Sequence, residues 1–303
     1  MYFTALPDHS EPGFDEKLHF GKFNKHNIIF NALSSKSYCE RHVGSFSIKT
    51  VLSGEEWYGI DNRQIAVRPG QFLILNDDQE YSCRIDSPVQ VNTLSICFKK
   101  EFAYSVFRDV SCTEEKVLDI PHDSEGHFHE FYQTLYTTGS TIKQKLLNLV
   151  AALNEYGYHK DMVDEHLVFL LYDLVHVHKI VSNQAKRVCA VKPTTRKEIY
   201  KRLCMAKDLL HSTFMHKPDL AAMSKTACLS VPQLIRQFKA VFQTTPHQYL
   251  NKVRLAHAKE LLKVSDLQLS EITIGCGFEN TSAFCRSFKK EFGVTPLYFR
   301  SAC

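Results

Sequence analysis

The sequence lacks any apolar run of membrane-spanning length. A stretch such as Leu167–Leu171 is far too short to cross a bilayer, because a transmembrane helix needs about 20 consecutive apolar residues. The first thirty residues also contain no apolar run of signal-peptide length, so they do not resemble a secretory leader. We therefore expect a cytoplasmic protein that makes no contact with a membrane.

Closely spaced cysteine pairs, typical of zinc sites and redox motifs, are also missing. The chain has 10 cysteines but no CxxC pair, and without a leader a disulfide framework is not expected. Intracellular thiols are usually reduced, and such cysteines are usually buried. We expect reduced, mostly buried thiols at the ten positions, which are Cys39, Cys83, Cys97, Cys112, Cys189, Cys204, Cys228, Cys276, Cys285 and Cys303.

What is present is an ordinary globular composition with an uneven charge. The 303 residues are 44% hydrophobic and 23% charged, which suits two domains that each bury a core. Net charge is +4, yet residues 191–303 carry 18 Lys and Arg against 8 Asp and Glu, and residues 1–190 carry 19 against 25. The basic part favours a polyanionic partner, although solubility alone would account for the charge equally well.

Two kinds of periodicity divide the chain. From about Leu18 to Phe98, short β-rich runs alternate with turn residues such as Pro69-Gly70, which predicts a small antiparallel barrel or sandwich. From about Lys99 to Val181 the apolar residues recur every three or four positions, which predicts helices. The residues that show this spacing are Phe128, Phe131 and Leu135, followed by Leu146, Leu149 and Ala152.

The same patterns give the domain organisation. Residues 182–195 have no periodicity and contain a proline, so we interpret them as a linker between domains. The sequence thus predicts an α+β protein, with a β-barrel and helices over residues 1–181 and an all-α domain over 196–303. In the first domain, the apolar stripe Leu167, Leu171 and Leu174 fits either a dimer contact or packing against the barrel.

A repeat with an offset of fifty residues runs through the C-terminal domain. The shift superposes apolar, basic and turn positions together, which indicates one supersecondary unit used twice. The matched pairs are Leu234 and Phe284, Arg236 and Arg286, Phe238 and Phe288, Lys239 and Lys289, Phe242 and Phe292, Thr245 and Thr295, Pro246 and Pro296, and Tyr249 and Phe299.

Each copy has the signals of a capped helix. Ser230, with Gln233 three residues on, fits an N-terminal capping box, and Asn280 is the equivalent cap of the second copy. A shorter helix precedes each one, and Gly275 and Gly277 stand where a tight turn between helices needs small residues or positive φ angles. A short helix, a turn and a capped helix with an apolar inner face predict a helix-turn-helix motif in each copy.

A longer helix is predicted between the two motifs. It starts with Thr245 as the cap and Pro246 at the first helical position. About nineteen residues at ~1.5 Å each give roughly 28 Å, which approaches the ~34 Å between successive major-groove faces of B-DNA. A rigid spacer of this length would let one chain place two recognition helices in adjacent grooves.

The segment from about Arg196 to Arg300 resembles the DNA-binding domain of the AraC/XylS family of bacterial transcriptional regulators. The residues that carry the resemblance are Ile272, Gly277-Phe278, Phe284 to Lys289, Phe292-Gly293 and Thr295-Pro296. The resemblance implies promoter DNA and RNA polymerase as partners, a homodimer and a small-molecule effector, with activation as the usual outcome. It implies no cofactor, no metal and no catalytic residue.

The resemblance also implies that the outer faces of both recognition helices contact DNA. Pro232 and Ile235 cannot hydrogen-bond a base edge through their side chains, so they would contact thymine methyl groups or set the register. Arg236 and Arg286 are the candidates for guanine, with a phosphate contact or a surface salt bridge as the alternatives. The full set is Pro232, Gln233, Ile235, Arg236 and Lys239, then Thr281, Ser282, Ala283, Arg286 and Lys289.

The strands of the N-terminal half resemble the cupin-type barrel that many of these regulators carry as an effector or dimerisation domain. Metal-dependent cupins use a His-x-His pair, a Glu and a later His, but His42 stands alone here and no histidine follows Pro69-Gly70 closely. His42, Trp57 and Tyr58 are the candidates for ligand contacts. At most one of the adjacent pair Trp57 and Tyr58 can face the interior, and an aromatic residue there is more often core.

Three functions remain open from the sequence. The first is a transcription regulator in which the barrel controls how two helix-turn-helix units meet promoter DNA. The second is a constitutive architectural DNA binder, which needs no pocket in the barrel. The third is a cupin-like enzyme with an accessory DNA-binding tail, which the missing ligand set argues against.

Overall fold

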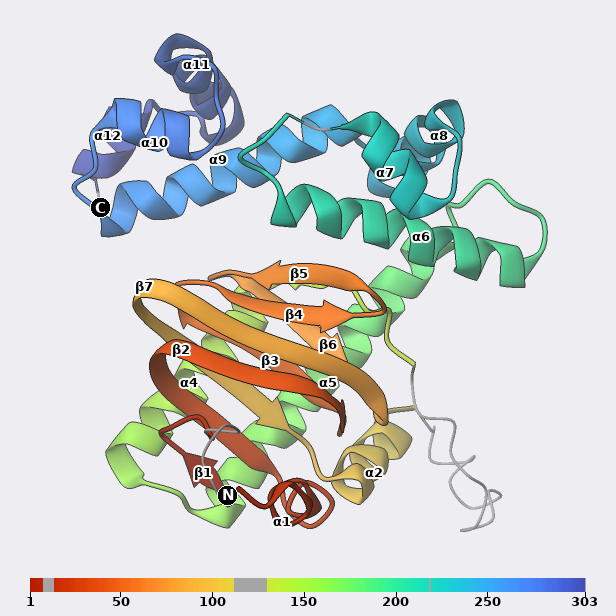
Figure 1. Cartoon of the computed structure of the whole chain (residues 1–303), viewed down its shortest axis with the longest axis vertical. Coiled ribbons are helices and arrows are strands. Elements are labelled where there is room, and N and C mark those ends of the chain that lie inside the picture. The colour runs from red at the N-terminus through yellow and green to blue at the C-terminus, as the bar shows by residue number, and fades with distance from the viewer. Residues whose placement is uncertain (8–13, 112–129, 218, 303) are drawn as a thin grey trace. The chain divides into compact units, whose positions relative to one another are not determined.

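The computed structural model describes residues 1–7, 14–111, 130–217 and 219–302 (Figure 1). The chain divides into two compact units, residues 1–183 and residues 184–303. Each unit buries its own core, so each is described by itself. Within the described residues, no helix combines the length and the apolar character needed to cross a membrane.

The N-terminal unit is built on an eight-stranded sheet of order β1-β2-β7-β3-β6-β8, from which the β4–β5 ribbon branches at β7. Two long strands, β2 and β7, pair antiparallel along most of their length. The strands are β1 Tyr2–Phe3, β2 Ile28–Gly44, β3 Ser47–Ser53, β4 Glu56–Ile60, β5 Arg63–Val67, β6 Gln71–Leu75, β7 Gln79–Cys97 and β8 Leu135–Thr137. The structure therefore confirms a sheet-rich first unit, largely antiparallel, as the alternation predicts.

The interior of the sheet is apolar because β-branched and aromatic side chains recur at its inward positions. Strand β4 alternates strictly, with Tyr58 and Ile60 almost fully buried and Trp57 on the other face. Ile65, Val67 and Leu73 complete this part of the core. The pair Trp57 and Tyr58 thus points to opposite faces, as the strand period of two requires.

Helices accompany the sheet in the described part of this unit. They are α1 Glu16–Gly21, α2 Lys100–Ser111, α4 Ser140–Tyr156 and α5 Lys160–Ala185. The stripe Leu167, Leu171 and Leu174 of α5 is completely buried, so it packs within the unit and is not the surface of a dimer. Phe169 and Tyr172 are exposed on the same helix.

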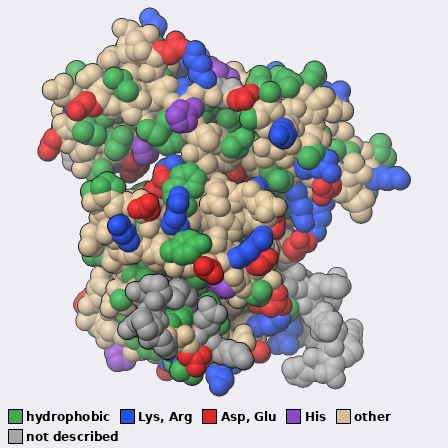
Figure 2. Space-filling view, viewed as in Figure 1, with side chains coloured by type: hydrophobic (Ala, Val, Ile, Leu, Met, Phe, Trp, Pro, Cys, Tyr) green, Lys and Arg blue, Asp and Glu red, His purple; other side chains and the backbone are tan. Residues whose placement is uncertain are grey.

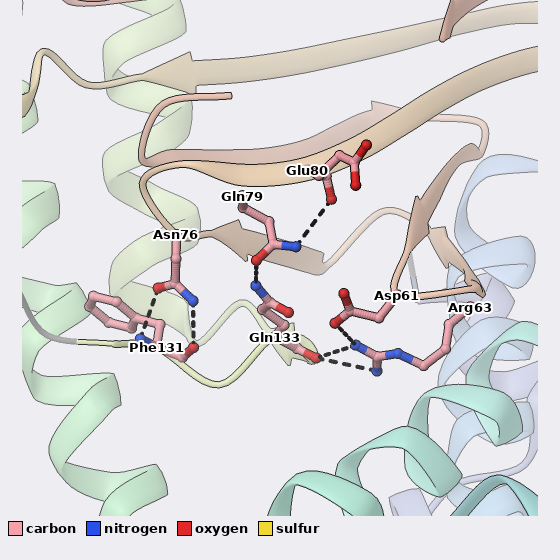
Figure 3. Close-up of polar contacts among 7 residues, drawn as sticks. All are labelled: Asp61, Arg63, Asn76, Gln79, Glu80, Phe131 and Gln133. Carbon is pink, nitrogen blue, oxygen red and sulfur yellow. Dashed lines mark hydrogen bonds and ion pairs between the residues drawn. The ribbon is translucent and has the colours of Figure 1, made fainter. Parts of the chain in front are cut away.

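The prediction of a helix around Phe131 and Leu135 is wrong. Phe131 is outside any helix, and Leu135 begins strand β8, which pairs with β6 at Leu73. The Asn76 side chain binds the Phe131 backbone twice, since Nδ2 donates to the carbonyl at 2.9 Å and Oδ1 accepts from the amide at 2.9 Å (Figure 3). These long-range hydrogen bonds fix the segment in a non-helical conformation, although the spacing of its apolar residues is typical of a helix. Phe128 lies outside the described residues.

A second set of polar contacts holds the same segment. The Arg63 guanidinium donates to the Gln133 carbonyl at 3.4 Å, and the Gln133 side chain donates to that of Gln79 (Figure 3). Residues 130–137 are therefore anchored by side chains from three different parts of the sheet. Sequence spacing carries no signal for such partners.

The C-terminal unit is entirely helical and shows the predicted repeat. Helix α8 spans Val231–Phe242 and α11 spans Thr281–Phe292, an offset of fifty residues at both ends. The other helices are α6 Pro193–Ser212, α7 Leu220–Ala227, α9 Pro246–Val264, α10 Leu269–Gly275 and α12 Pro296–Ser301. Because α5 continues to Ala185 and α6 starts at Pro193, the irregular segment between them is shorter than residues 182–195.

No disulfide is formed among the described residues. Cys39, Cys97, Cys204 and Cys276 are buried, Cys83 and Cys285 are half-buried, and Cys189 and Cys228 are exposed. Burial raises the pKa of the Cys276 thiol to about 12, so this group is neutral at physiological pH. Cys112 and Cys303 lie outside the described residues.

The burial of the α5 stripe can be tested by unfolding. Leu171→Ala removes a fully buried leucine and should lower the free energy of unfolding by about 2–5 kcal/mol. Tyr172→Ala, at an exposed neighbouring site, should cost less than about 1 kcal/mol. Urea unfolding followed by fluorescence of Trp57, the single tryptophan of the chain, reports on this unit. An equal decrease in the free energy of unfolding for the two variants would contradict the burial of Leu171.

Candidate nucleic-acid interface

Helix α8 is fixed by a cap at its start and by an apolar inner face. The Ser230 amide donates to Gln233 Oε1 at 3.2 Å, as the predicted capping box requires. Leu234, Phe238 and Val241 are fully buried on the inner face. The opposite face is therefore held outward by packing that the helical period dictates.

Helix α11 repeats this arrangement with a different cap. Asn280 Oδ1 accepts from the Ala283 amide at 2.8 Å, which satisfies one of the free N–H groups at the helix start. Phe284 and Phe288, the equivalents of Leu234 and Phe238, are fully buried. The two caps and the two inner faces confirm that both helices begin in register.

Short helices precede both capped helices and complete two helix-turn-helix motifs. We call α7 with α8 the first motif and α10 with α11 the second motif. In the second turn Gly277 has a φ of +76°, as expected, whereas Gly275 still belongs to α10 and has open space around it. In the first turn Cys228 takes the left-handed conformation with a φ of +47°. One residue per turn therefore needs a positive φ.

The ten residues proposed for DNA contacts lie on the outer faces of α8 and α11, and none is buried. Ile235, Thr281 and Ala283 are half-buried beside the inner faces. The exposed members are Pro232, Gln233, Arg236, Lys239, Ser282, Arg286 and Lys289. The structure thus brings each set of five onto one helix face.

The cations of these faces have no protein partner within the described chain. Arg236, Lys239, Arg286 and Lys289 are exposed, and none of them forms a hydrogen bond or an ion pair with a described residue. Neither arginine therefore forms the surface salt bridge that we considered with any residue that the structure describes. Figure 2 shows lysine and arginine side chains dispersed over this face of the molecule, singly or in small groups, with acidic side chains between them.

Helix α9 carries both motifs. It has 19 residues, as predicted, and at ~1.5 Å per residue it is about 28 Å long. Figure 1 shows it running between the α7–α8 pair and the group of α10, α11 and α12. Near its start the Tyr249 ring lies 5.6 Å from that of Phe238, measured between ring centres, and from its middle to its end Leu255 and Leu262 share the core of Phe284 and Phe288.

The first motif is also tied to the segment before α6. Gln237, almost fully buried on α8, accepts from the Cys189 amide at 3.0 Å and donates to its carbonyl at 3.3 Å. Sequence reasoning missed this residue. Its place within the apolar face of α8 was a signal, because a polar residue at a core position needs internal partners.

The N-terminal unit contains a hollow beside the expected ligand residues. A cavity of about 240 Å³ is lined by His42, Phe20, Phe23 and Tyr81, and a smaller one that shares these residues reaches Tyr58. Trp57 is half-buried on the opposite face of β4. Of the three candidates, the structure brings His42 and Tyr58 to one cavity and separates Trp57 from it.

Polar groups inside this unit were not predicted. Lys49 and Glu56 are almost fully buried, and both line the smaller cavity. Glu56 Oε2 accepts from Thr93 Oγ1 at 2.6 Å, and burial raises the pKa of this carboxyl. Among the described residues, no group of three or more His, Cys, Asp or Glu side chains could hold a metal ion.

Comparison with known proteins agrees with this geometry. Residues 223–302 match the family model described as a helix-turn-helix domain. The C-terminal unit contains a helix-turn-helix domain. The match runs from within α7 to the end of α12 and so includes both recognition helices. It supports the resemblance to AraC/XylS regulators for this part of the chain only.

Curated relatives match over a similar region. The HTH-type transcriptional activators RhaR of Salmonella arizonae and Salmonella newport are each 45% identical over 67 residues, which is 22% of this chain and 24% of theirs. The chain thus spans about a quarter of the length of the curated relatives it matches. The cupin-like barrel remains a prediction.

Solved structures show weaker likeness. The DNA-binding domain of AdpA in complex with a target DNA is 25% identical, covers 33% of this chain and 90% of its own, and has a TM-score of 0.32. ToxT from Vibrio cholerae is 14% identical, covers 90% of this chain and 94% of its own, and has a TM-score of 0.36.

The cap of α11 gives a direct test of the second motif. Asn280→Ala removes the acceptor for the Ala283 amide and should destabilise the helix start by about 1 kcal/mol. Hydrogen exchange of the first α11 amides should then rise about fivefold. Asn280→Ser keeps a capping oxygen and serves as the control. If alanine and serine gave the same exchange rates, the cap would not hold this helix.

Proposed function

We propose that this chain is a sequence-specific DNA-binding transcription regulator of the AraC/XylS type. The observation that carries the proposal is the pair of equivalent outer faces on α8 and α11, each with an arginine and a lysine that have no partner among the described residues. Cations left unpaired at the surface are available to phosphates and base edges. The helix-turn-helix match over residues 223–302 supports the same class.

The two arginines are proposed to give most of the base discrimination. Arg236 and Arg286 occupy equivalent positions, and an arginine fork can bind guanine O6 and N7 together. Lys239 and Lys289 each lie three residues after the arginine on the same helix face, and we propose that they contact phosphates. Pro232 and Ile235 make the first motif more apolar than the second, so we expect thymine methyl contacts there.

We assign control of this activity to residues 1–183. The cavity at His42 and Tyr58 supports a small-molecule effector, and the exposed Phe169 and Tyr172 leave a surface for a homodimer. Activation through RNA polymerase is proposed because the RhaR relatives carry the name transcriptional activator. A cytoplasmic location goes with DNA as the partner. These proposals extend the prediction of a cupin-like sensor or dimerisation domain.

Selection of random duplex DNA by the full chain, repeated at two salt concentrations, tests the main proposal. Counterion release makes phosphate attraction strongly salt-dependent, whereas base readout selects a motif. We expect two half-elements about 10 base pairs apart. Binding with a steep salt dependence and no motif would favour the architectural binder. Stoichiometric Fe, Mn or Zn in the purified protein would favour the enzyme with a DNA-binding tail.

The arginine assignment gives a sharper prediction. Arg236→Ala and Arg286→Ala should each relax specificity at one guanine, by about 1–3 kcal/mol, and the double variant should lose discrimination between sites. Titration of the selected duplex and of single-base variants measures this. Lys290→Ala, an exposed cation on α11, is the control and should weaken all sequences alike. Unchanged specificity in the double variant would disprove the assigned readout.

A further inference from the structure

The segment between α6 and α7 extends from the first motif to the middle of α9. Phe214 in this segment is buried, and its ring contacts the imidazole of His257 edge-on at 4.8 Å. Thr213, at the end of α6, closes that helix with a backbone bond to Leu209. Residues 213–217, which we call the bridging segment, therefore have a defined position against α9.

One arginine of α9 holds this segment. Arg254 Nε donates to the Phe214 carbonyl at 2.7 Å, and its Nη2 donates to the His216 carbonyl at 2.8 Å. The side chain is 8% exposed, and its guanidinium carbon lies 5.8 Å from the ring centre of Phe278 in the second turn. The same guanidinium thus contacts the bridging segment and the turn of the second motif.

The turn of the second motif approaches the bridging segment directly. A Cβ atom at Gly277 would clash with the carbonyl oxygen of Met215 and would lie 2.9 Å from its carbon. Only glycine permits this contact, because the φ of +76° and the missing side chain are both needed. At the rim, Lys217 and Glu279 form an exposed ion pair at 3.1 Å.

The hydrogen bonds of Arg254 differ in kind from the apolar packing inside the two motifs. The first motif buries Leu234 and Phe238, and the second buries Phe284 and Phe288. Arg254 instead satisfies two backbone carbonyls that belong to neither recognition helix. What its contacts restrain is therefore the position of one motif relative to the other, since a helix alone can bend and twist along its length.

We propose that Arg254, together with Gly277, fixes the geometry of the two recognition helices and so determines the spacing of the DNA half-elements that the protein accepts. This inference rests on the proposed function. Arg254 is a positioning residue, because it acts through the bridging segment and touches no part of the proposed DNA surface. A rigid pair of helices binds two half-elements at one spacing, whereas a loosened pair accepts several spacings at a lower affinity.

A panel of duplexes tests the proposal with the full chain. Each duplex carries both selected half-elements, with centres about 8 to 13 base pairs apart, and further duplexes carry one half-element alone. We expect the wild-type protein to prefer one spacing by at least about tenfold. Arg254→Ala should reduce that preference to about threefold or less, while its affinity for a single half-element stays within about twofold.

Further variants separate positioning from stability. Arg254→Lys can donate to one carbonyl and should keep part of the preference for one spacing. Gly277→Ala should abolish that preference even though Arg254 is still present. Lys263→Ala removes an exposed α9 cation whose ion pair is with Glu260 of the same helix, and it should behave as wild type. If Arg254→Ala fails to fold, the spacing profile of Gly277→Ala is the test of the proposal.

Several results would overturn the proposal. One is an unchanged spacing profile in both Arg254→Ala and Gly277→Ala. Another is a wild-type protein that binds all spacings equally. Loss of single half-element binding in step with paired binding would assign Arg254 to stability alone. A wild-type protein that binds no half-element would instead contradict the DNA-binding function itself, so that this failure is distinct from a failure of the positioning role of Arg254.

Discussion

The C-terminal unit depends on one constraint, which is that a single helix must complete two separate hydrophobic cores. Helix α9 contributes Tyr249 to the aromatic cluster of the first motif and Leu255 and Leu262 to that of the second. Burial of the inner face of a recognition helix determines which face of that helix is exposed. Exposure of Arg236 and Arg286 is thus a consequence of where Phe238 and Phe288 are buried.

Sharing one helix also creates a problem that apolar packing does not solve. The two cores share the 19-residue helix α9, and apolar packing within each core leaves their relative orientation to other contacts. The structure places a buried, doubly hydrogen-bonded arginine and a glycine contact at the middle of the helix. A charged group in this role is directional, because its hydrogen bonds need a fixed geometry that apolar contacts do not.

The N-terminal unit combines a hydrophobic sheet with polar groups that the core does not require. Lys49, Glu56 and Tyr58 are buried next to the cavities, and burial raises the pKa values of Glu56 and Tyr58. Burying such groups costs stability unless they have partners. Their concentration beside one hollow is the reason we propose an effector site there.

The sequence by itself determined the elements whose signals are local. The caps Ser230, Thr245 and Asn280, the length of α9 and the outer faces of α8 and α11 all follow from periodicity and capping, which act over a few neighbouring residues. Tertiary structure alone decided the strand at Leu135, the burial of Leu171, the inward position of Lys49 and the contact between Arg254 and the bridging segment. Each of these depends on partners far away in the chain, and the energy of a long-range contact leaves no periodic pattern in the sequence.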